Sequence, residues 1–174
     1  MKYPMIIIVS GLPGSGKSHF AVQLAALMGA EYINSDGIRS MMLETPTYSD
    51  KEKWMVYDEM LRLAINAAAD GRDIVLDATF YTRALREVFA RTLDKAGRVS
   101  FIEIVAEEEL IRERLKRPRR DSDANFEIYR EMKELWEPYD VPRLELRSTN
   151  ENTDSLLDRA MEYIHQETYE PGRD

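Results

Sequence analysis

Short apolar runs alternate with helical patterns from one end of the chain to the other. The first run, residues 5–9, has no polar interruption, which is typical of a strand buried on both faces of a parallel sheet. The other expected strands are residues 31–34, 73–79, 99–105 and 143–149. Apolar residues at helical spacing predict helices at residues 20–28, 50–69, 82–95, 107–117, 126–136 and 156–164. This alternation predicts an α/β fold in which helices cover both faces of a five-stranded parallel sheet.

Two of the expected helices have residues that their spacing assigns to the core. Ser49 and Glu52 have the spacing of a capping box at the start of the second helix. The pattern places on one face of that helix Trp54, Tyr57, Leu61, Ile65 and Ala68, and we interpret both aromatic residues as core. In the helix at residues 82–95, the side chains expected to point inward are Leu85, Val88, Phe89 and Leu93.

A glycine-rich loop follows the first strand and leads into a helical pattern. Its residues are Gly11, Leu12, Pro13, Gly14, Ser15, Gly16, Lys17 and Ser18. Glycines let successive backbone N–H groups turn toward one anion, and the following helix adds its own unpaired N–H groups. In this spacing the lysine reaches the β- and γ-phosphates of a nucleotide and the serine hydroxyl ligates Mg²⁺. A plain turn needs no such combination, so we expect a nucleotide site here, with ATP and Mg²⁺ as ligands.

Polar residues also stand at the ends of the other expected strands. They are Asp36 and Arg39, Asp77 and Thr79, and Thr149 with Asn150. In a parallel sheet the carboxyl ends of the strands meet at one edge, where ligands bind. We therefore expect these residues to lie around the glycine-rich loop.

Asp36 and Arg39 are open to two interpretations. Asp36 is a common residue for the cap of a helix N-terminus. A capping box, however, has Glu or Gln three residues later, whereas Arg39 would place a cation near the positive end of the helix. A site for an anionic ligand explains that arrangement, and we favour it over the cap.

Asp77 and a cluster of basic residues complete the candidate chemistry. Asp77 ends an apolar strand, as a carboxylate that holds the Mg²⁺ shell does, although a solvated strand end is the alternative. The basic cluster consists of Arg112, Arg114, Lys116, Arg117, Arg119 and Arg120. A charged helix face is usually solvated and paired at helical spacing. Because these cations gather at one end beside a polar loop, we expect a lid at about residues 112–125.

Composition narrows the class of protein. The chain of 174 residues suits one domain, residues 1–174. Its net charge of −8 argues against a protein that coats long nucleic acids. The absence of cysteine fits a reducing cytoplasm, and the first apolar run is too short for a signal peptide or a membrane span.

The order of these motifs resembles the P-loop kinases grouped with the kinase domain of polynucleotide 5′-hydroxyl kinase, including small AAA-type, zeta-toxin-like kinases. The matching segments are residues 11–18, 34–39, 76–80 and 114–117. The resemblance implies a P-loop NTPase three-layer sandwich, nucleoside-kinase-like, with the loop strand in the middle and the third strand beside it. It implies that Asp36 is the base for the acceptor hydroxyl and that Arg39 holds the acceptor's phosphate. It also implies that Arg114 and Arg117 contact the nucleotide, Arg117 at the transferring phosphate.

The leading hypothesis is an ATP-dependent phosphotransferase. Its acceptor is expected to be a hydroxyl of a small molecule or of a 5′-hydroxyl nucleic-acid end, with no extended nucleic-acid binding and no membrane partner. The site residues are then Lys17, Asp36, Arg39 and Arg117 for catalysis, and Ser18 with Asp77 for the metal. One alternative is a regulatory ATPase without an acceptor, and another is a zeta-toxin-like nucleotide-sugar kinase.

Overall fold

A computed structural model describes residues 3–117 and 125–168, and it contains one parallel sheet. Its strands are β1 (Met5–Ser10), β2 (Glu31–Asn34), β3 (Ile74–Asp77), β4 (Arg98–Val105) and β5 (Leu144–Arg147). They lie in the order β2-β3-β1-β4-β5, and every neighbouring pair is parallel. The loop strand β1 is therefore central, with β3 beside it, which confirms the predicted fold class.

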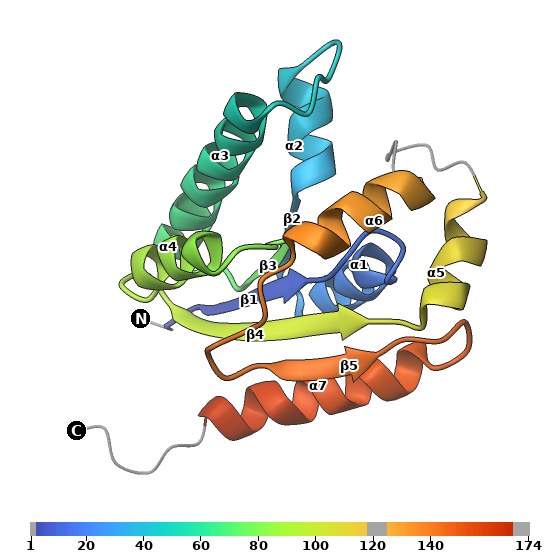
Figure 1. Ribbon diagram of the computed structural model, residues 1–174. Coiled ribbons are helices and arrows are strands. Elements are labelled where there is room, and N and C mark those ends of the chain that lie inside the picture. Colours follow the sequence, from blue (N-terminus) through green and yellow to red (C-terminus); the bar gives the residue numbers. More distant parts are fainter. Residues whose placement is uncertain (1–2, 118–124, 169–174) are drawn as a thin grey trace.

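Helices cover both faces of this sheet (Figure 1). They are α1 (Lys17–Met28), α2 (Ser35–Met42), α3 (Asp50–Ala69), α4 (Arg83–Leu93), α5 (Glu108–Leu115), α6 (Phe126–Leu135) and α7 (Thr153–Thr168). One face packs against α3 and α4, and the other packs against α1 and α7. Within the described residues, no helix combines the length and the apolarity that a membrane span requires.

The central strand divides its side chains between the two cores. Ile6 and Ile8 lie in the core under α3 and α4, whereas Ile7 and Val9 lie in the core under α1 and α7. All four are fully buried, because successive side chains of a strand point to opposite faces. The uninterrupted apolar run thus has the structure that its pattern predicts.

Three of the predicted core positions are wrong. Trp54 and Ile65 are 53% and 39% exposed, since α3 buries the face that carries Met60 and Ala64. Val88 is 44% exposed, whereas Arg86 two positions earlier is buried. The two terminal nitrogens of the Arg86 guanidinium donate to the carbonyl oxygens of residues 80, 137 and 138. These bonds compensate most of the cost of burying a cation that a hydrophobic pattern assigns to the surface.

Buried and half-buried tyrosines should lower the stability of this fold at alkaline pH. Burial raises the pKa of Tyr139 to about 12, and burial likewise raises the pKa values of Tyr57 and Tyr32. A phenol whose pKa is raised on folding stabilises the protein below the unfolded value of about 10, and this stability is lost as the pH rises through the folded pKa.

We therefore expect delayed ionisation in a spectrophotometric titration. Between pH of about 10 and 11, the phenolate absorbance of the folded protein should fall short of that of its nine tyrosines in the unfolded protein at the same pH. Tyr139→Phe should remove one late-titrating group. Full ionisation of all tyrosines before unfolding would contradict the prediction.

Candidate active site

The loop between β1 and α1 needs its glycines for both backbone angles and space. Gly14 and Gly16 have φ angles of 79° and 92°, in the left-handed region that side chains disfavour. A Cβ on Gly11 would lie 2.5 Å from the carbonyl oxygen of Ile104, and one on Gly14 would lie 2.9 Å from Cγ2 of Ile111. The loop is therefore packed tightly against β4 and α5.

This loop delivers an uncapped helix N-terminus to a cavity. The N-cap of α1 is Gly16, and no side chain accepts from its first N–H groups. Of the loop residues, Pro13, Gly14, Lys17 and Ser18 line the cavity, whereas Gly11, Leu12, Ser15 and Gly16 are not among its described lining residues. Unpaired N–H groups, a positive dipole end and a lysine together form a site for a polyphosphate.

Arg114 supports the loop from its rear side. Its Nη1 donates to the carbonyl oxygens of Gly14 and Ser15, at 3.2 and 3.0 Å, and to the hydroxyl of Ser148 at 3.0 Å. Its Nε donates to Oδ1 of Asn150. These bonds hold the phosphate-binding backbone, which is a contribution that sequence reasoning did not anticipate.

The rest of the basic cluster is only partly described. Arg117 is exposed, and it is not among the described residues that line the cavity. The predicted lid runs from α5 to the start of α6, and its residues 118–124 lie outside the described residues. The helices on either side confirm the predicted helices at 107–117 and 126–136 within two residues at each end.

The candidate metal ligands are linked by Tyr32, which sequence reasoning missed. Asp77 is 2% exposed, and its Oδ2 accepts a 2.5 Å hydrogen bond from the Tyr32 hydroxyl. The same phenol interacts with the Ser18 hydroxyl, and burial together with Asp77 raises the pKa of Tyr32. Oδ1 of Asp77 is buried without a hydrogen-bond partner. A hydroxyl and an orphaned carboxylate oxygen are the hard ligands that Mg²⁺ prefers, so this donor set fits the ion.

The N-terminus of α2 corrects the interpretation of Asp36 as a cap. The N-cap is Asn34, whose Oδ1 accepts from the N–H of Gly37 at 2.6 Å. Asp36 stands in the first turn and lines the cavity. Arg39 belongs to the last turn of this eight-residue helix, so the argument from a cation at the positive helix end is also wrong.

Arg39 lies between two carboxylates. Its Nη1 donates to Oδ1 of Asp36 at 3.1 Å, and its Nε lies 3.5 Å from Oε1 of Glu52. Glu52 is 6% exposed, and its Oε2 accepts from the N–H and the hydroxyl of Thr47, both at 2.7 Å. Burial would raise the pKa of Glu52, but the bonds from Thr47 and the charge of Arg39 hold it below its ordinary value. Sequence reasoning found Glu52 only as part of a capping box.

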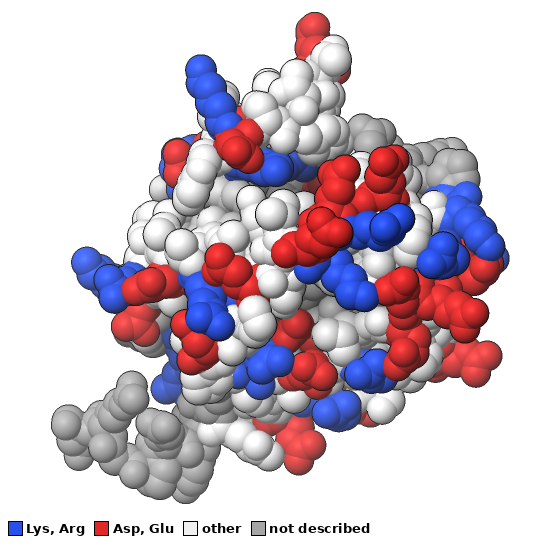
Figure 2. Space-filling view, in the orientation of Figure 1, with Lys and Arg blue, Asp and Glu red and all other residues white. Residues whose placement is uncertain are grey.

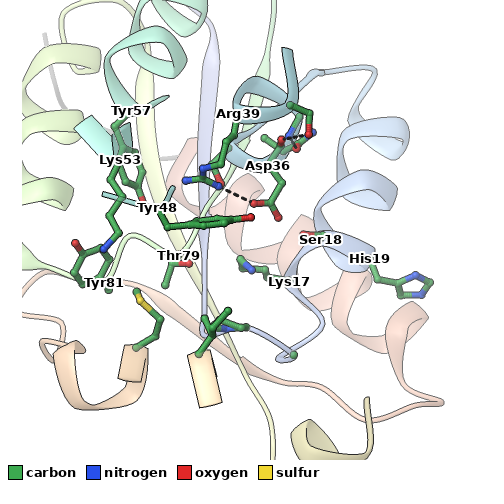
Figure 3. A pocket seen from close by; sticks show the side chains of 18 of the residues that line it. Lys17, Ser18, His19, Asp36, Arg39, Tyr48, Lys53, Tyr57, Thr79 and Tyr81 are labelled. Atoms are coloured by element: carbon green, nitrogen blue, oxygen red, sulfur yellow. Dashed lines mark hydrogen bonds and ion pairs between the residues drawn. The ribbon is translucent and has the colours of Figure 1, made fainter. Parts of the chain in front are cut away.

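Aromatic residues form part of the remaining wall of the cavity. Its volume is about 930 Å³, and Figure 3 shows Lys17 and Ser18 below Asp36 and Arg39. We call the acceptor side the part lined by Asp36, Arg39, Tyr48, Lys53, Tyr57 and Tyr81. Tyr48 has a left-handed φ of 56°, and the centre of its ring lies 4.9 Å from the Arg39 guanidinium carbon. Ile128, Glu131 and Met132 of α6 line the same cavity.

Comparisons with known proteins agree with this geometry. Residues 6–139 match the model of the AAA domain family. A UPF0200 protein of Aeropyrum pernix is 32% identical over 136 residues, which cover 71% of this chain and 70% of that protein. An uncharacterized protein of Mycobacterium tuberculosis is also 32% identical, but the match covers only 18% of its length and 43% of this chain.

Solved structures share the fold. The APS kinase CysC of Mycobacterium tuberculosis, in complex with AMPPNP and APS, has a TM-score of 0.72 at 16% identity and covers 95% of this chain and 99% of its own. A sugar kinase from Janibacter sp. HTCC2649 has a TM-score of 0.71 at 17% identity, covering 93% and 95%. A chain of the Pnkp1/Rnl/Hen1 RNA repair complex has a TM-score of 0.60 at 20% identity, covering 86% and 51%. The resemblance to P-loop kinases is thereby confirmed at the level of the fold, and the chain belongs to the AAA domain family.

Proposed function

We propose that this protein is an ATP-dependent phosphotransferase that moves the γ-phosphate of Mg-ATP to an acceptor hydroxyl. The observation that carries the proposal is one cavity with two chemically different sides. Lys17 and Ser18 on the phosphate loop line one side, and Asp36 with Arg39 lines the other. Phosphoryl transfer needs donor and acceptor held in line, and this arrangement supplies both positions.

On the nucleotide side, the residues hold and neutralise phosphates. The loop N–H groups bind the β-phosphate, and Lys17 bridges to the γ-phosphate. Ser18 and Asp77 would hold Mg²⁺, and the ion would supply positive charge that neutralises the phosphate oxygens. Arg117 is our candidate for contact with the transferring phosphate.

On the acceptor side, Asp36 aligns the hydroxyl and takes its proton. The acceptor oxygen forms the new bond to the γ-phosphorus as the bond to the ADP oxygen breaks, and the proton passes to a carboxylate oxygen of Asp36. Arg39 fixes the direction of that carboxylate through the 3.1 Å bond. The kinases among the structural neighbours support this reaction class, and a cytoplasmic setting suits it.

ADP release with and without acceptors tests the proposal. A transferase should release ADP faster when a suitable nucleoside or sugar is added, and the phosphate should appear on that compound. A regulatory ATPase, the second hypothesis, has no use for Asp36 facing the loop. It would release ADP and inorganic phosphate at one rate with every acceptor, and that result would overturn the transferase.

Tyr32→Phe is expected to weaken Mg²⁺ binding and to leave the fold intact. The substitution removes the hydroxyl that orients Asp77 at 2.5 Å but keeps the ring. Loss of such an outer partner lowers metal affinity by about tenfold. The measurement is calorimetric titration of ADP at several Mg²⁺ concentrations, together with Mn²⁺ binding followed by electron paramagnetic resonance. Tyr81→Phe, which changes a cavity tyrosine with no such bond to Asp77, is the matched control. Equal metal affinity in both variants would contradict the role of Tyr32.

A further inference from the structure

We infer that the acceptor is an electrically neutral ring compound with several hydroxyls, of the sugar or nucleoside type, and not a phosphorylated compound or a nucleic-acid end. The inference rests on the proposed function and specifies its acceptor. Three features of the structure carry it: the ion pairs of Arg39, the charge balance of the acceptor side, and the aromatic surface at Tyr48.

Arg39 is the residue that an acceptor phosphate would need, but its guanidinium is already paired with two carboxylates. Its side chain is 12% exposed and lies between Asp36 at 3.1 Å and Glu52 at 3.5 Å. Glu52 is ionised, because Thr47 and Arg39 hold its pKa below the ordinary value against the effect of burial. The group of three thus carries a net charge of about −1. A phosphate that approached Arg39 would also approach two carboxylates.

The other charged residues on the acceptor side do not offset this negative charge. Among the described lining residues, the acceptor side adds the cation Lys53, and α6 adds the carboxylate of Glu131. Nζ of Lys53 lies 3.5 Å from Oδ1 of Asp50, with which it forms an ion pair, and 5.9 Å from the centre of the Tyr81 ring. Like charges brought together on binding cost several-fold to many-fold in affinity. The acceptor side therefore disfavours a second phosphate group.

The same contacts that neutralise Arg39 also present an aromatic face. Glu52 accepts hydrogen bonds from the backbone of Thr47 and Tyr48, and this fixes the loop in which Tyr48 has φ of 56°. Tyr48 is 40% exposed, and its ring reaches into the cavity below Arg39 (Figure 3). Sugar rings and nucleobases pack their faces on tyrosine, while their hydroxyls meet carboxylates such as Asp36.

Among the described residues on the face drawn in Figure 2, no continuous basic stripe offers a separate place for a polyanion. A nucleic-acid end brings further phosphates, which must meet a basic stripe outside the cavity. Figure 2 shows Lys and Arg interspersed with Asp and Glu over the face that it presents, and the net charge is −8. A neutral acceptor needs no such stripe.

Matched acceptor pairs test the inference with the full chain. Each pair leaves the primary hydroxyl free: adenosine with adenosine 3′-monophosphate, and D-glucose with glucose 1-phosphate, alongside a short 5′-hydroxyl oligothymidylate. The readout is acceptor-dependent ADP release at saturating Mg-ATP. We expect kcat/KM for a neutral member to exceed that of its phosphorylated partner by about tenfold or more. Equal or higher use of a phosphorylated member or of the oligonucleotide would overturn the inference while leaving the kinase intact. No acceptor-dependent release with any compound would overturn the proposed function itself.

Glu52→Gln links the preference to the charge on Arg39. The amide keeps an oxygen for Thr47 but removes the negative charge, so Arg39 gains attraction for an anion. The preference for the neutral member should fall by about threefold to tenfold in this variant. Glu59→Gln, which changes a carboxylate of the same helix paired with Arg62, should leave it unchanged. Melting temperatures establish that both variants fold. If Glu52→Gln does not fold, the wild-type preference decides alone. An unchanged preference in folded Glu52→Gln would overturn the assignment of selectivity to this carboxylate.

Discussion

Lys17→Ala is expected to lower turnover severely and to weaken ATP binding. The Lys17 ammonium is the cation of the phosphate side, placed at the start of α1 where the helix N–H groups face the same cavity. In phosphoryl transfer most of the catalysis is charge stabilisation, so loss of one such donor should lower kcat by roughly a hundredfold to a thousandfold.

The remaining cations of the cavity do not replace it. Arg39 is neutralised by two carboxylates, and Lys53 lies beside Asp50 and Tyr81. ADP release and nucleotide affinity should be measured on Lys17→Ala and on Lys95→Ala, an exposed lysine after α4, as the control for charge. Undiminished turnover in Lys17→Ala would contradict the assignment of the glycine-rich loop as the nucleotide site.

The parts of this molecule that sequence predicts well are those determined by neighbours in the chain. The burial of residues 5–9 follows from their unbroken apolar run, and the turn at residues 11–18 follows from glycines whose φ angles other residues disfavour. Gly29 ends α1 in a left-handed conformation for the same local reason. The central position of β1 and its pairing with β3 followed from the resemblance to P-loop kinases.

The parts that sequence missed depend on partners far along the chain. Arg86 is buried because carbonyl groups about 50 residues away accept its hydrogen bonds, and no local pattern contains them. Tyr32 bonds to Asp77, which is 45 residues away in sequence and on the neighbouring strand β3. The cap at Asn34 was missed for a smaller reason, since three adjacent polar residues can each cap a helix and the backbone selects one.

Asp36→Asn is expected to preserve the fold and nucleotide affinity while it lowers phosphoryl transfer by roughly a hundredfold or more. The amide keeps the size of the side chain but accepts no proton from the acceptor hydroxyl. Because the cap of α2 is Asn34, loss of the carboxylate leaves the helix N-terminus satisfied. The Asp36 side chain is 41% exposed, so loss of its pairing with Arg39 should change stability little.

Asn34→Ala supplies the matched comparison for stability. This substitution removes the cap itself and should destabilise the protein by about 1 kcal/mol, whereas both Asp36→Asn and Asp36→Ala should melt close to the wild type. The three variants should be compared in melting temperature, ADP affinity and acceptor phosphorylation. Transfer lost at an unchanged melting temperature assigns Asp36 to the reaction. A lowered melting temperature with intact transfer in Asp36→Ala would show that the carboxylate serves only the structure of α2.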